Sequence, residues 1–346
     1  MPPTIYDIAK KARVGIGTVS RVFNNHPSVS PATKDRVLRV ANKLQYHPHP
    51  YARGLARRRT NSILAVIPFF STFFFIEVLQ GVQATLSTTD YDLLLFGITH
   101  LDHIDASLKR IAGRNRADGI LYFSMEMPEA FATEYLQQKV PLILVDTYHR
   151  NFDSFQVDNT EGAAIATKHL VDLGHQRIGI LLANLESPPA KQRREGFERA
   201  MHEAGLPVQP EWVKWSNSSR LDGFTREDGY LQMKEFLKLR SSMPSAIFVS
   251  SDIQASGALS AIEEAGLRCP DDVALVGFDD IELAGHLGLT TMRQPMAKMG
   301  LLAALRLAER MENPALPAKQ TTFVPELIVR KTSGAGARMP VPVPMS

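Results

Sequence analysis

The sequence predicts a small all-α head of helix-turn-helix type followed by a larger α/β core. Three observations support this division. Apolar residues recur at helical spacing over the first 44 residues, the net charge changes sign near residue 60, and short apolar runs alternate with amphipathic helical patterns beyond that point. A chain of 346 residues is also too long for a single hydrophobic core, so more than one domain is expected.

Residues 4–24 contain two short helical patterns separated by a three-residue turn. The residues expected to face inward are Ile5, Ile8, Ala9 and Ala12 in the first helix, Val14 in the turn, and Val19, Val22 and Phe23 in the second helix. The outer face of the second helix then holds Ile16, Gly17, Thr18, Ser20 and Arg21, where a DNA major groove would meet them. An ordinary helical hairpin has the same pattern, so the charge distribution is needed to distinguish a DNA-binding helix-turn-helix from such a hairpin.

The charge distribution favours DNA binding. Residues 1–60 contain twelve basic and two acidic side chains, a net charge of +10. The other 286 residues contain 27 basic and 34 acidic side chains, a net charge of −7. A basic head on an acidic body is the distribution that binding to a phosphate backbone requires.

A third helix follows, with Ser30 as its N-cap and Pro31 at its first position. Its buried stripe is expected to consist of Val37, Val40, Ala41 and Leu44. After it, two prolines keep residues 46–51 extended, because the residue before a proline is pushed out of helical geometry. Residues 51–56 predict a further helix that is too short to be stable alone and is expected to form on DNA.

Residues 4–60 resemble the DNA-binding head of the LacI/GalR family of bacterial transcription regulators. The resemblance rests on residues 4–9 (TIYDIA), 18–22 (TVSRV), 24–25 (NN), 29–33 (VSPAT) and 52–55 (ARGL), and on Tyr46 with Pro48, all in family order and spacing. It implies that the second helix enters the major groove. It also implies that the hinge helices of two subunits pair and insert a leucine, here Leu55, into the minor groove at the operator's centre.

The resemblance assigns roles to individual residues of the head. The base-reading positions are Ile16, Gly17 and Arg21, the phosphate contacts are Thr4, Thr18, Ser20, Asn24, Ser30, Thr33 and Tyr46, and the minor-groove positions are Ala52, Arg53 and Leu55. Arg21 is the main candidate reader, because a guanidinium can donate two hydrogen bonds to guanine, worth about 1–3 kcal/mol of discrimination. The alternative interpretation of the phosphate set is ordinary helix caps and surface hydroxyls.

Three residues depart from the family pattern and predict a head of marginal stability. Arg13 stands where Gly or Asn is usual, and a left-handed conformation there costs a residue with a Cβ about 1 kcal/mol. Gly15 replaces the hydroxyl residue that commonly caps the recognition helix, and Gly17 inside that helix costs about 1 kcal/mol relative to alanine. We therefore expect the isolated fragment 1–60 to be loosely folded without DNA.

Beyond residue 60 the pattern is that of repeated βαβ units with parallel sheets. The apolar runs that predict strands are 62–68, 91–97, 118–123, 141–146, 177–183, 245–250 and 273–277. The most apolar stretch, residues 63–79, is shorter than a membrane span and contains Pro68 and Glu77. We therefore interpret it as a strand, a turn and a helix.

The compartment expected from the sequence is the cytoplasm. The N-terminus is polar and has no apolar stretch typical of a secretory signal. Cys269 is the only cysteine, so no disulfide can form within one chain. The tail, residues 333–346, is rich in Gly, Pro and Met and is expected to be disordered.

The body of the chain also resembles LacI/GalR regulators, whose cores are similar to periplasmic sugar-binding proteins. The resemblance rests on residues 173–179 (LGHQRIG), 193–197 (RREGF), 204–206 (AGL), 251–257 (SDIQASG), 276–280 (VGFDD) and 289–295 (LTTMRQP). It implies two doubly wound parallel-sheet subdomains of periplasmic-binding-protein type, joined by three crossovers. It also implies that an effector binds in the cleft between them.

The expected domain boundaries follow from these assignments. They are a helix-turn-helix head at 1–47, a hinge helix and linker at 48–60, a core for effector binding and dimerisation at 61–332, and the tail at 333–346. Within the core, the N-subdomain is expected to hold about 61–159 and 292–322, and the C-subdomain about 160–291 and 323–332.

The resemblance also assigns an effector site. Its expected residues are Phe74, Phe75, Asp146, Arg193, Phe224, Ser251, Asp279 and Gln294. Arg193 and Asp279 are the main polar candidates, because a guanidinium and a carboxylate can share the donors and acceptors of a hydroxylated ligand. Their alternative interpretation is a structural salt bridge. Residues 187–190 (SPPA) stand where some relatives have a second arginine or hydroxyls, so a purine-like or charged ligand and a protein partner stay open beside the default, a neutral sugar.

An enzyme is the alternative from another functional class. The sequence has no Gly-rich phosphate loop, no Gly-x-Ser-x-Gly elbow, and no His or Cys spacing suited to zinc, so no catalytic site, cofactor or metal is expected. The sequence as a whole predicts a homodimeric repressor that binds a palindromic operator and responds to a small molecule. The remaining alternatives are a solute-binding protein without DNA function and a regulator controlled by a protein corepressor.

Overall fold

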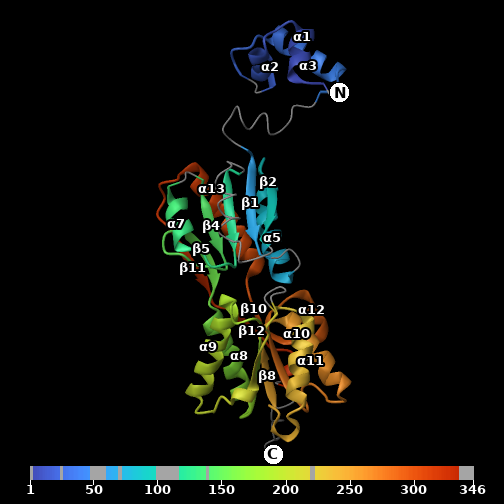
Figure 1. Cartoon of the computed structure of the whole chain (residues 1–346), viewed down its shortest axis with the longest axis vertical. Helices are drawn as coiled ribbons and strands as arrows, with labels where there is room; N and C mark the ends of the chain where they lie inside the picture. The colour runs from blue at the N-terminus through green and yellow to red at the C-terminus, as the bar shows by residue number, and fades with distance from the viewer. Residues whose placement is uncertain are drawn as a thin grey trace, which may run out of the picture. The chain divides into compact units, whose positions relative to one another are not determined.

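The computed structural model describes residues 3–23, 26–46, 60–68, 72–98, 117–137, 140–218 and 223–334 (Figure 1). The chain divides into two units, residues 1–62 with 114–118, and residues 63–113 with 119–346. The first unit contains a helical head, and the second contains the α/β core. No helix among the described residues is long and apolar enough to cross a membrane.

The head consists of α1 (Ile5–Ala12), α2 (Ile16–Phe23) and α3 (Pro31–Lys43). Its inner side chains are those that the helical spacing predicts. Ile8, Val19 and Val37, one from each helix, are fully buried and form the centre of a small apolar cluster. Each helix is amphipathic, so its stability depends on this shared contact.

The first and third helices begin at polar caps. The Thr4 backbone N–H at the start of α1 donates to the Asp7 carboxylate at 2.8 Å. In α3 the Thr33 N–H lies 3.4 Å from the Ser30 hydroxyl oxygen, and Pro31 occupies the first turn. Each bond satisfies a backbone group that the helix end leaves unpaired. The predicted Ser30 cap and Pro31 position are confirmed.

The turn between α1 and α2 is strained at Arg13. This residue lies in the left-handed region, with φ 53° and ψ 49°. The next helix then begins without a side-chain cap, because Gly15 offers only its carbonyl oxygen, which accepts the Thr18 N–H at 2.9 Å. Both features are those that predicted marginal stability for the head.

The first sheet of the core has the strand order β11-β5-β4-β3-β1-β2. Its strands are β1 (Ser62–Ile67), β2 (Asp92–Gly97), β3 (Gly119–Phe123), β4 (Leu142–Val145), β5 (Asp153–Val157) and β11 (Gln320–Phe323), and α7 (Glu129–Leu136) follows β3. The pairings from β1 through β3, β4 and β5 to β11 are parallel. The helices α5 (Phe73–Leu86) and α13 (Met296–Glu312) pack together against this sheet. Their backbones are so close that a Cβ on Gly81 would lie 1.9 Å from the Ala297 carbonyl oxygen.

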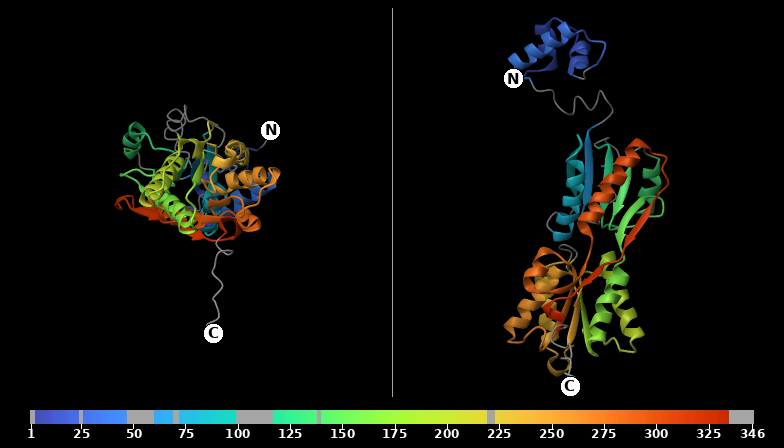
Figure 2. Two further views of the ribbon diagram at one scale, coloured as in Figure 1. Left: turned by 90° about the horizontal axis from the view of Figure 1, so that it is seen from below. Right: turned by 180° about the vertical axis from the view of Figure 1, so that it is seen from behind.

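The second sheet has the strand order β12-β10-β9-β8-β6-β7. Its strands are β6 (Ile178–Leu182), β7 (Val213–Trp215), β8 (Ala246–Val249), β9 (Ala274–Asp279), β10 (Thr290–Arg293) and β12 (Glu326–Ile328), and only β12 pairs antiparallel. One face is covered by α8 (Asn159–Asp172) and α9 (Pro188–Glu203), and the other by α10 (Arg226–Leu237) and α11 (Asp252–Glu264), as Figure 2 shows from behind. Helices on both faces of a parallel sheet are typical of a doubly wound fold.

The chain passes between the two sheets three times, after β5, after β10 and after β11. The predicted fold, a helical head followed in the chain by two doubly wound sheets with three crossovers, is confirmed. The second passage falls slightly later than the expected boundary at residue 292, because β10 lies in the second sheet as far as Arg293. Ligands in such folds bind at the carboxyl ends of the strands, which is where the crossovers lie.

Each of the seven apolar runs contains a strand in the structure. Five further strands were not predicted: β5, β7, β10, β11 and β12. They are short and contain polar residues, and β7, β11 and β12 are partly exposed at or near sheet edges. Such strands form no apolar run, so hydrophobic periodicity does not reveal them.

The sequence assigns Ser333 to a disordered tail, but the structure places this residue against the core. Ser333 is 2% exposed and lies in a short 3-10 helix, Lys331–Ser333. Its side chain accepts a hydrogen bond from the Thr290 hydroxyl of β10 at 3.0 Å. The expectation of disorder was wrong for Ser333, because this polar pair holds it against the second sheet. Residues 335–346 lie outside the described part of the chain.

Candidate DNA-binding surface and effector cavity

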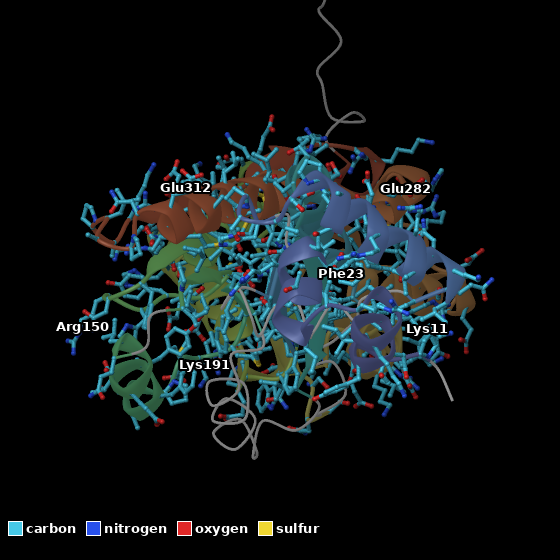
Figure 3. All side chains as sticks on the ribbon, turned by 90° about the horizontal axis from the view of Figure 1, so that it is seen from above. Lys11, Phe23, Arg150, Lys191, Glu282 and Glu312 are labelled. Atoms are coloured by element: carbon cyan, nitrogen blue, oxygen red, sulfur yellow. The ribbon has the colours of Figure 1, made fainter. Side chains whose placement is uncertain are left out.

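The outer face of α2 is open. Ile16 is 43% exposed, and Gly17 and Arg21 are exposed beside it. A Cβ built on Gly17 would meet no atom within 4 Å, so nothing in the head covers this position. Lys11 of α1 also points outward from the head (Figure 3). The three expected base-reading residues therefore share an accessible surface of one helix.

Several expected phosphate contacts also have roles inside the head. Those in the described residues are Thr4, Thr18, Ser20, Ser30, Thr33 and Tyr46. The Thr4 hydroxyl donates to the Asp7 carboxylate at 2.7 Å, and the Ser30 hydroxyl donates to the Thr33 hydroxyl at 3.0 Å. These groups act as helix caps, and a hydroxyl can keep this role while it faces a phosphate. The expected contacts outside the described residues are Asn24, Ala52, Arg53 and Leu55.

The other expected phosphate contacts lie close to the helix packing of the head. Thr18 and Ser20 are half-buried on α2. Tyr46 follows α3, and its ring centroid lies 5.7 Å from that of Phe23 at the end of α2. The Tyr46 ring thus fixes the end of the third helix against the second, with its position set by packing.

A cavity of about 750 Å³ lies in the core between residues of the two sheets. All eight residues of the expected effector site line it: Phe74, Phe75, Asp146, Arg193, Phe224, Ser251, Asp279 and Gln294. They come from segments far apart in the sequence that end near the crossovers. Its volume is within the range of small-molecule sites in proteins.

Arg193 of α9 is almost fully buried and is held from several sides. Its guanidinium lies 3.7 Å from the centre of the Phe278 ring, and its Nε donates to the Asn159 side-chain oxygen at 2.9 Å. Its Nη1 donates to the Ser250 carbonyl oxygen and lies 3.7 Å from the Asp279 carboxylate. Burial lowers the pKa of Arg193, and Asp279 opposes this effect. The group keeps its charge because an arginine pKa is far above neutral pH.

Asp279 ends β9 and faces the same cavity with an unusual backbone, φ 120°. Its Oδ1 accepts a hydrogen bond from Gln294 Nε2 at 2.6 Å. Burial raises the pKa of Asp279, while Arg193 and the Gln294 bond lower it. Asp146 raises it further, because two carboxylates near each other disfavour a second negative charge.

Asp146 supplies a carboxylate from the first sheet. It follows β4 in the left-handed conformation, φ 56°, and its Oδ2 accepts a hydrogen bond from the Ser124 hydroxyl at 2.7 Å. Burial raises the pKa of Asp146 to about 6, although the Ser124 bond and Arg193 oppose the shift. The cavity is therefore lined by a partly buried carboxylate from each sheet, Asp146 and Asp279, and the Arg193 guanidinium lowers the pKa of both.

Asp280, next to Asp279, has a different role. Its carboxylate pairs with Arg293 at 2.7 Å and with Arg330 at 2.7 Å, residues that follow or end strands of the second sheet. Asp280 is not among the residues that line the cavity. The two adjacent carboxylates thus do not share one ligand position.

Two polar atoms in the cavity wall have no hydrogen-bond partner among the residues that the structure describes. They are Gln294 Oε1 and Thr72 Oγ1, both buried. Leaving a buried polar atom unpaired costs about 1–3 kcal/mol. Both atoms can accept a hydrogen bond, so a ligand that carries hydroxyl or N–H donors would satisfy them.

The aromatic residues of the site differ in exposure. Phe75 is 4% exposed, and its ring packs against Phe123 of β3, 6.2 Å between centroids, so it belongs to the core of the first sheet. Phe74 packs edge-on against Phe75 and is half-buried. Phe224 lies 5.8 Å from the Arg193 guanidinium. Phe74 and Phe224 therefore offer apolar faces to the cavity, while Phe75 supports one of them.

Two family descriptions match this chain. "Bacterial regulatory proteins, lacI family" matches residues 4–49, and "Periplasmic binding protein-like domain" matches residues 167–333. The HTH-type transcriptional repressor PurR of Pasteurella multocida (strain Pm70) is 34% identical over 337 residues, which cover 95% of this chain and 98% of that protein. The chain belongs to the LacI family of bacterial regulatory proteins.

Other LacI-family relatives are similar over the same length. The ribose operon repressor of Haemophilus influenzae (strain ATCC 51907 / DSM 11121 / KW20 / Rd) is 33% identical over 335 residues, 95% of this chain and 98% of that protein. The lac repressor dimer bound to operator and the anti-inducer ONPF has a TM-score of 0.79 at 25% identity, covering 96% of this chain and 99% of that one. The transcriptional regulator CelR–cellobiose complex has a TM-score of 0.69 at 27% identity, covering 95% and 99%. These relatives are transcription regulators and not enzymes.

Some cavity residues of this LacI-family chain were not identified from the sequence. Thr72 and Ser124 line the cavity, and Asn159 holds Arg193 from the first crossover. Ser124 follows the carboxyl end of β3, so the rule that ligands bind at strand ends could have found it. Ser251, which was expected, caps α11 through the Gln254 N–H at 3.3 Å and already has this structural role. Among the described residues no group of His, Cys, Asp and Glu could hold a metal ion.

Proposed function

We propose that this chain is a homodimeric repressor that binds a palindromic operator and whose operator affinity is controlled by a small molecule in the core cavity. The observation that carries the proposal is the combination of an open recognition-helix face in a basic head with a cavity lined by Arg193, Asp146 and Asp279. A head with one recognition helix makes few base contacts, and two heads on a two-fold site double them. The place of action is then the cytoplasm, on the nucleoid.

The proposed effector is a neutral molecule rich in hydroxyl groups. The cavity has two acceptors without a partner among the described residues, Gln294 Oε1 and Thr72 Oγ1, and the carboxylates of Asp146 and Asp279 beside Arg193. Its other charged lining residues, Arg226, Glu227 and Glu264, are exposed. Vicinal hydroxyls can donate to a carboxylate and accept from a guanidinium at the same time. The half-buried rings of Phe74 and Phe224 can cover an apolar face of such a ligand. Ser187 and Pro189 line the cavity and add no charge to its wall.

The effector controls the heads through the equilibrium between two arrangements of the core. It can shift that equilibrium only by binding one arrangement more tightly than the other. Arg193 and Asp279 support this role, because each contacts a crossover: Arg193 through Asn159 after β5, and Asp279 through Gln294 after β10. A ligand that rearranges the pair therefore acts directly on two of the three connections.

The test uses the full-length chain. A palindromic duplex is first selected from random DNA, and gel shifts are then measured with and without each member of a panel. The panel contains ribose, other neutral pentoses and hexoses, cellobiose, their phosphate esters, and purine bases, and calorimetry measures direct binding. We expect a neutral sugar to bind and to change the operator affinity. Binding of no sugar would remove the sugar hypothesis, and retardation of no selected duplex would leave a solute-binding protein.

A further inference from the structure

Residues 60–62 join the linker to the first strand of the core, and a single carboxylate holds them. The Thr60 backbone N–H donates to Asp118 Oδ1 at 2.8 Å, and the Asn61 N–H donates to Asp118 Oδ2 at 2.9 Å. The Thr60 hydroxyl also donates to Oδ1, at 3.1 Å. In return, the Asp118 N–H donates to the Ser62 carbonyl oxygen at 2.8 Å. Both oxygens of one side chain are thus used to bind consecutive residues of the main chain.

The backbone is shaped for this contact. Asn61 lies in the left-handed region, φ 51°, which turns its N–H and that of Thr60 toward the same carboxylate. Asparagine tolerates this conformation better than most residues, although it still costs energy. The contact is additional to the sheet, because the ladder between β1 and β3 pairs Ile63 with Gly119 and continues from there. Hydrogen bonds to a charged acceptor are roughly twice as strong as neutral ones and repay this cost.

This contact lies at the point where the chain from the head enters the core. The sequence connects the helical head to the core only through residues 47–61, so every influence of the core on the head along the chain passes Thr60 and Asn61. When two linked modules bind one ligand, the second contact is made at an effective concentration set by the connection. A connection whose first residues rotate freely spreads the attached module over more orientations and lowers that concentration.

We propose that Asp118 is a positioning residue for operator binding: its carboxylate fixes the start of the linker and thereby raises the effective concentration of the second head when the first is bound. The inference rests on the proposed DNA-binding function. Asp118 touches neither DNA nor effector in this role. Its effect is therefore specific to a duplex that engages both heads, whereas a duplex with one half-site measures each head alone.

The first experiment compares full-length Asp118→Ala, Asp118→Asn and the control Asp92→Ala. Asp92 is an exposed aspartate at the start of β2, so its removal changes the charge equally. Affinities are measured by fluorescence anisotropy on the palindrome that the wild-type protein selects from random DNA, and on a duplex with one half-site. We expect Asp118→Ala to bind the palindrome at least tenfold more weakly and the half-site as wild type does. Asp118→Asn keeps one acceptor oxygen and should lie between the two.

The second experiment needs no DNA. Trypsin cleaves after arginine, and the bond between Arg59 and Thr60 contains the amide that Asp118 holds. We expect cleavage of this bond, followed by mass spectrometry, to be at least fivefold faster in Asp118→Ala than in wild type and unchanged in Asp92→Ala. Thermal unfolding of the core, followed by the fluorescence of Trp212 and Trp215, checks that each variant is folded.

The outcomes separate the inference from the proposed function. Unchanged palindrome affinity in Asp118→Ala overturns the inference, whatever the cleavage rate. An equal loss on the half-site also overturns it, because the residue would then act on the fold of the head. If wild-type protein selects no duplex, the proposed DNA binding fails. Faster cleavage in Asp118→Ala would then still show that the carboxylate anchors the chain, without a role in operator binding.

Discussion

The head and the core of this protein are stabilised to very different degrees. Among the described residues, the apolar centre of the head contains seven buried side chains, and three of them are alanines. The second sheet of the core alone is covered on both faces by separate clusters that include Phe197, Phe236, Phe248 and Phe278. Burial of apolar surface stabilises the folded state by about 25 cal/mol for each Å², so larger buried side chains contribute more to the free energy of unfolding. We therefore expect the core to be more stable than the head.

The head and the core also differ in where their strained and charged residues lie. In the head the left-handed residues are Arg13 and Gln45, both in turns that follow helices, and the charged groups are on the surface. In the core Ser124, Asp146 and Asp279 have positive φ after or at the ends of strands and line the cavity, whereas Arg240 and Asp280 have positive φ outside it. A stable scaffold can hold strained and partly desolvated groups in place for a ligand. The smaller apolar centre of the head offers less support for such groups.

The largest expected effect is that of Arg193→Ala on the core. The substitution leaves Asp279 and Asp146 without their cation and opens space beside Phe278. Removing one partner of a buried ion pair costs about 3–5 kcal/mol. We expect denaturant unfolding, followed by tryptophan fluorescence, to show this loss together with loss of effector binding. The control Arg194→Ala removes a half-exposed pair with Glu198 and should cost less than about 1 kcal/mol. Equal effects of the two variants would contradict the central role of Arg193.

In the head, the next largest effect concerns Arg21. Its side chain is exposed on the open face of α2. If it donates two hydrogen bonds to a guanine, Arg21→Ala should lose about 1–3 kcal/mol of discrimination at one base pair. Binding to a set of single-base variants of the selected duplex measures this. A uniform loss on every duplex would instead show that Arg21 contacts phosphate. Thr18→Val, on the same helix, is the control for a contact that does not read a base.

The difference between continuous apolar strands and strands that carry buried charges explains which elements the sequence could predict. The strands β1, β3 and β4 are continuous apolar runs because both of their faces are buried, so their composition predicts them. The strand β5 carries Asp153, which is fully buried and paired with Arg306 and Arg310 of α13. No periodicity reveals a buried charge whose partners lie more than 150 residues away in the chain. Its place is known only once the fold has brought the two segments together.

The candidate site also contains some residues that the sequence could predict and others that it could not. Arg193 and Asp279 could be assigned because they stand in motifs of known order and spacing. Thr72 and Asn159 belong to no such motif, and their roles come from geometry: an unpaired oxygen in the cavity wall and a bond to a guanidinium. From the sequence alone, a polar residue at a crossover cannot be distinguished from a polar residue in any other loop. The sequence therefore predicts the centre of the site better than its support.

A smaller effect is expected from the titration of Asp146. Its pKa in the folded core is about 6, above the ordinary value of 3.8. The folded state therefore binds the proton more tightly than the unfolded state, and the stability from this group is lost as the pH rises from about 4 to 7. Each pKa unit corresponds to about 1.4 kcal/mol, and the partial exposure of Asp146 to the cavity reduces the total to about 1–2 kcal/mol.

The variant Asp146→Asn removes this titration while it keeps an acceptor for Ser124. The difference in unfolding free energy between the variant and wild type should grow in favour of the variant between pH 4 and pH 7. Denaturant unfolding at several pH values, followed by tryptophan fluorescence, measures it. Asp92→Asn serves as the exposed control. A difference that stays constant with pH would contradict the raised pKa.

The smallest effect tests the strain in the head. Arg13 pays the cost of a left-handed conformation, so Arg13→Gly should stabilise the fragment 1–60 by about 1 kcal/mol. Arg36 is exposed within α3, where the same substitution should destabilise the fragment by about 1 kcal/mol, because glycine is a poor helix former. The helical circular dichroism signal of the two fragment variants should therefore change in opposite directions from that of the wild-type fragment. This pair isolates backbone conformation from charge, because each variant loses one arginine. Shifts in the same direction would mean that charge repulsion within the basic head, and not the turn at Arg13, limits its stability.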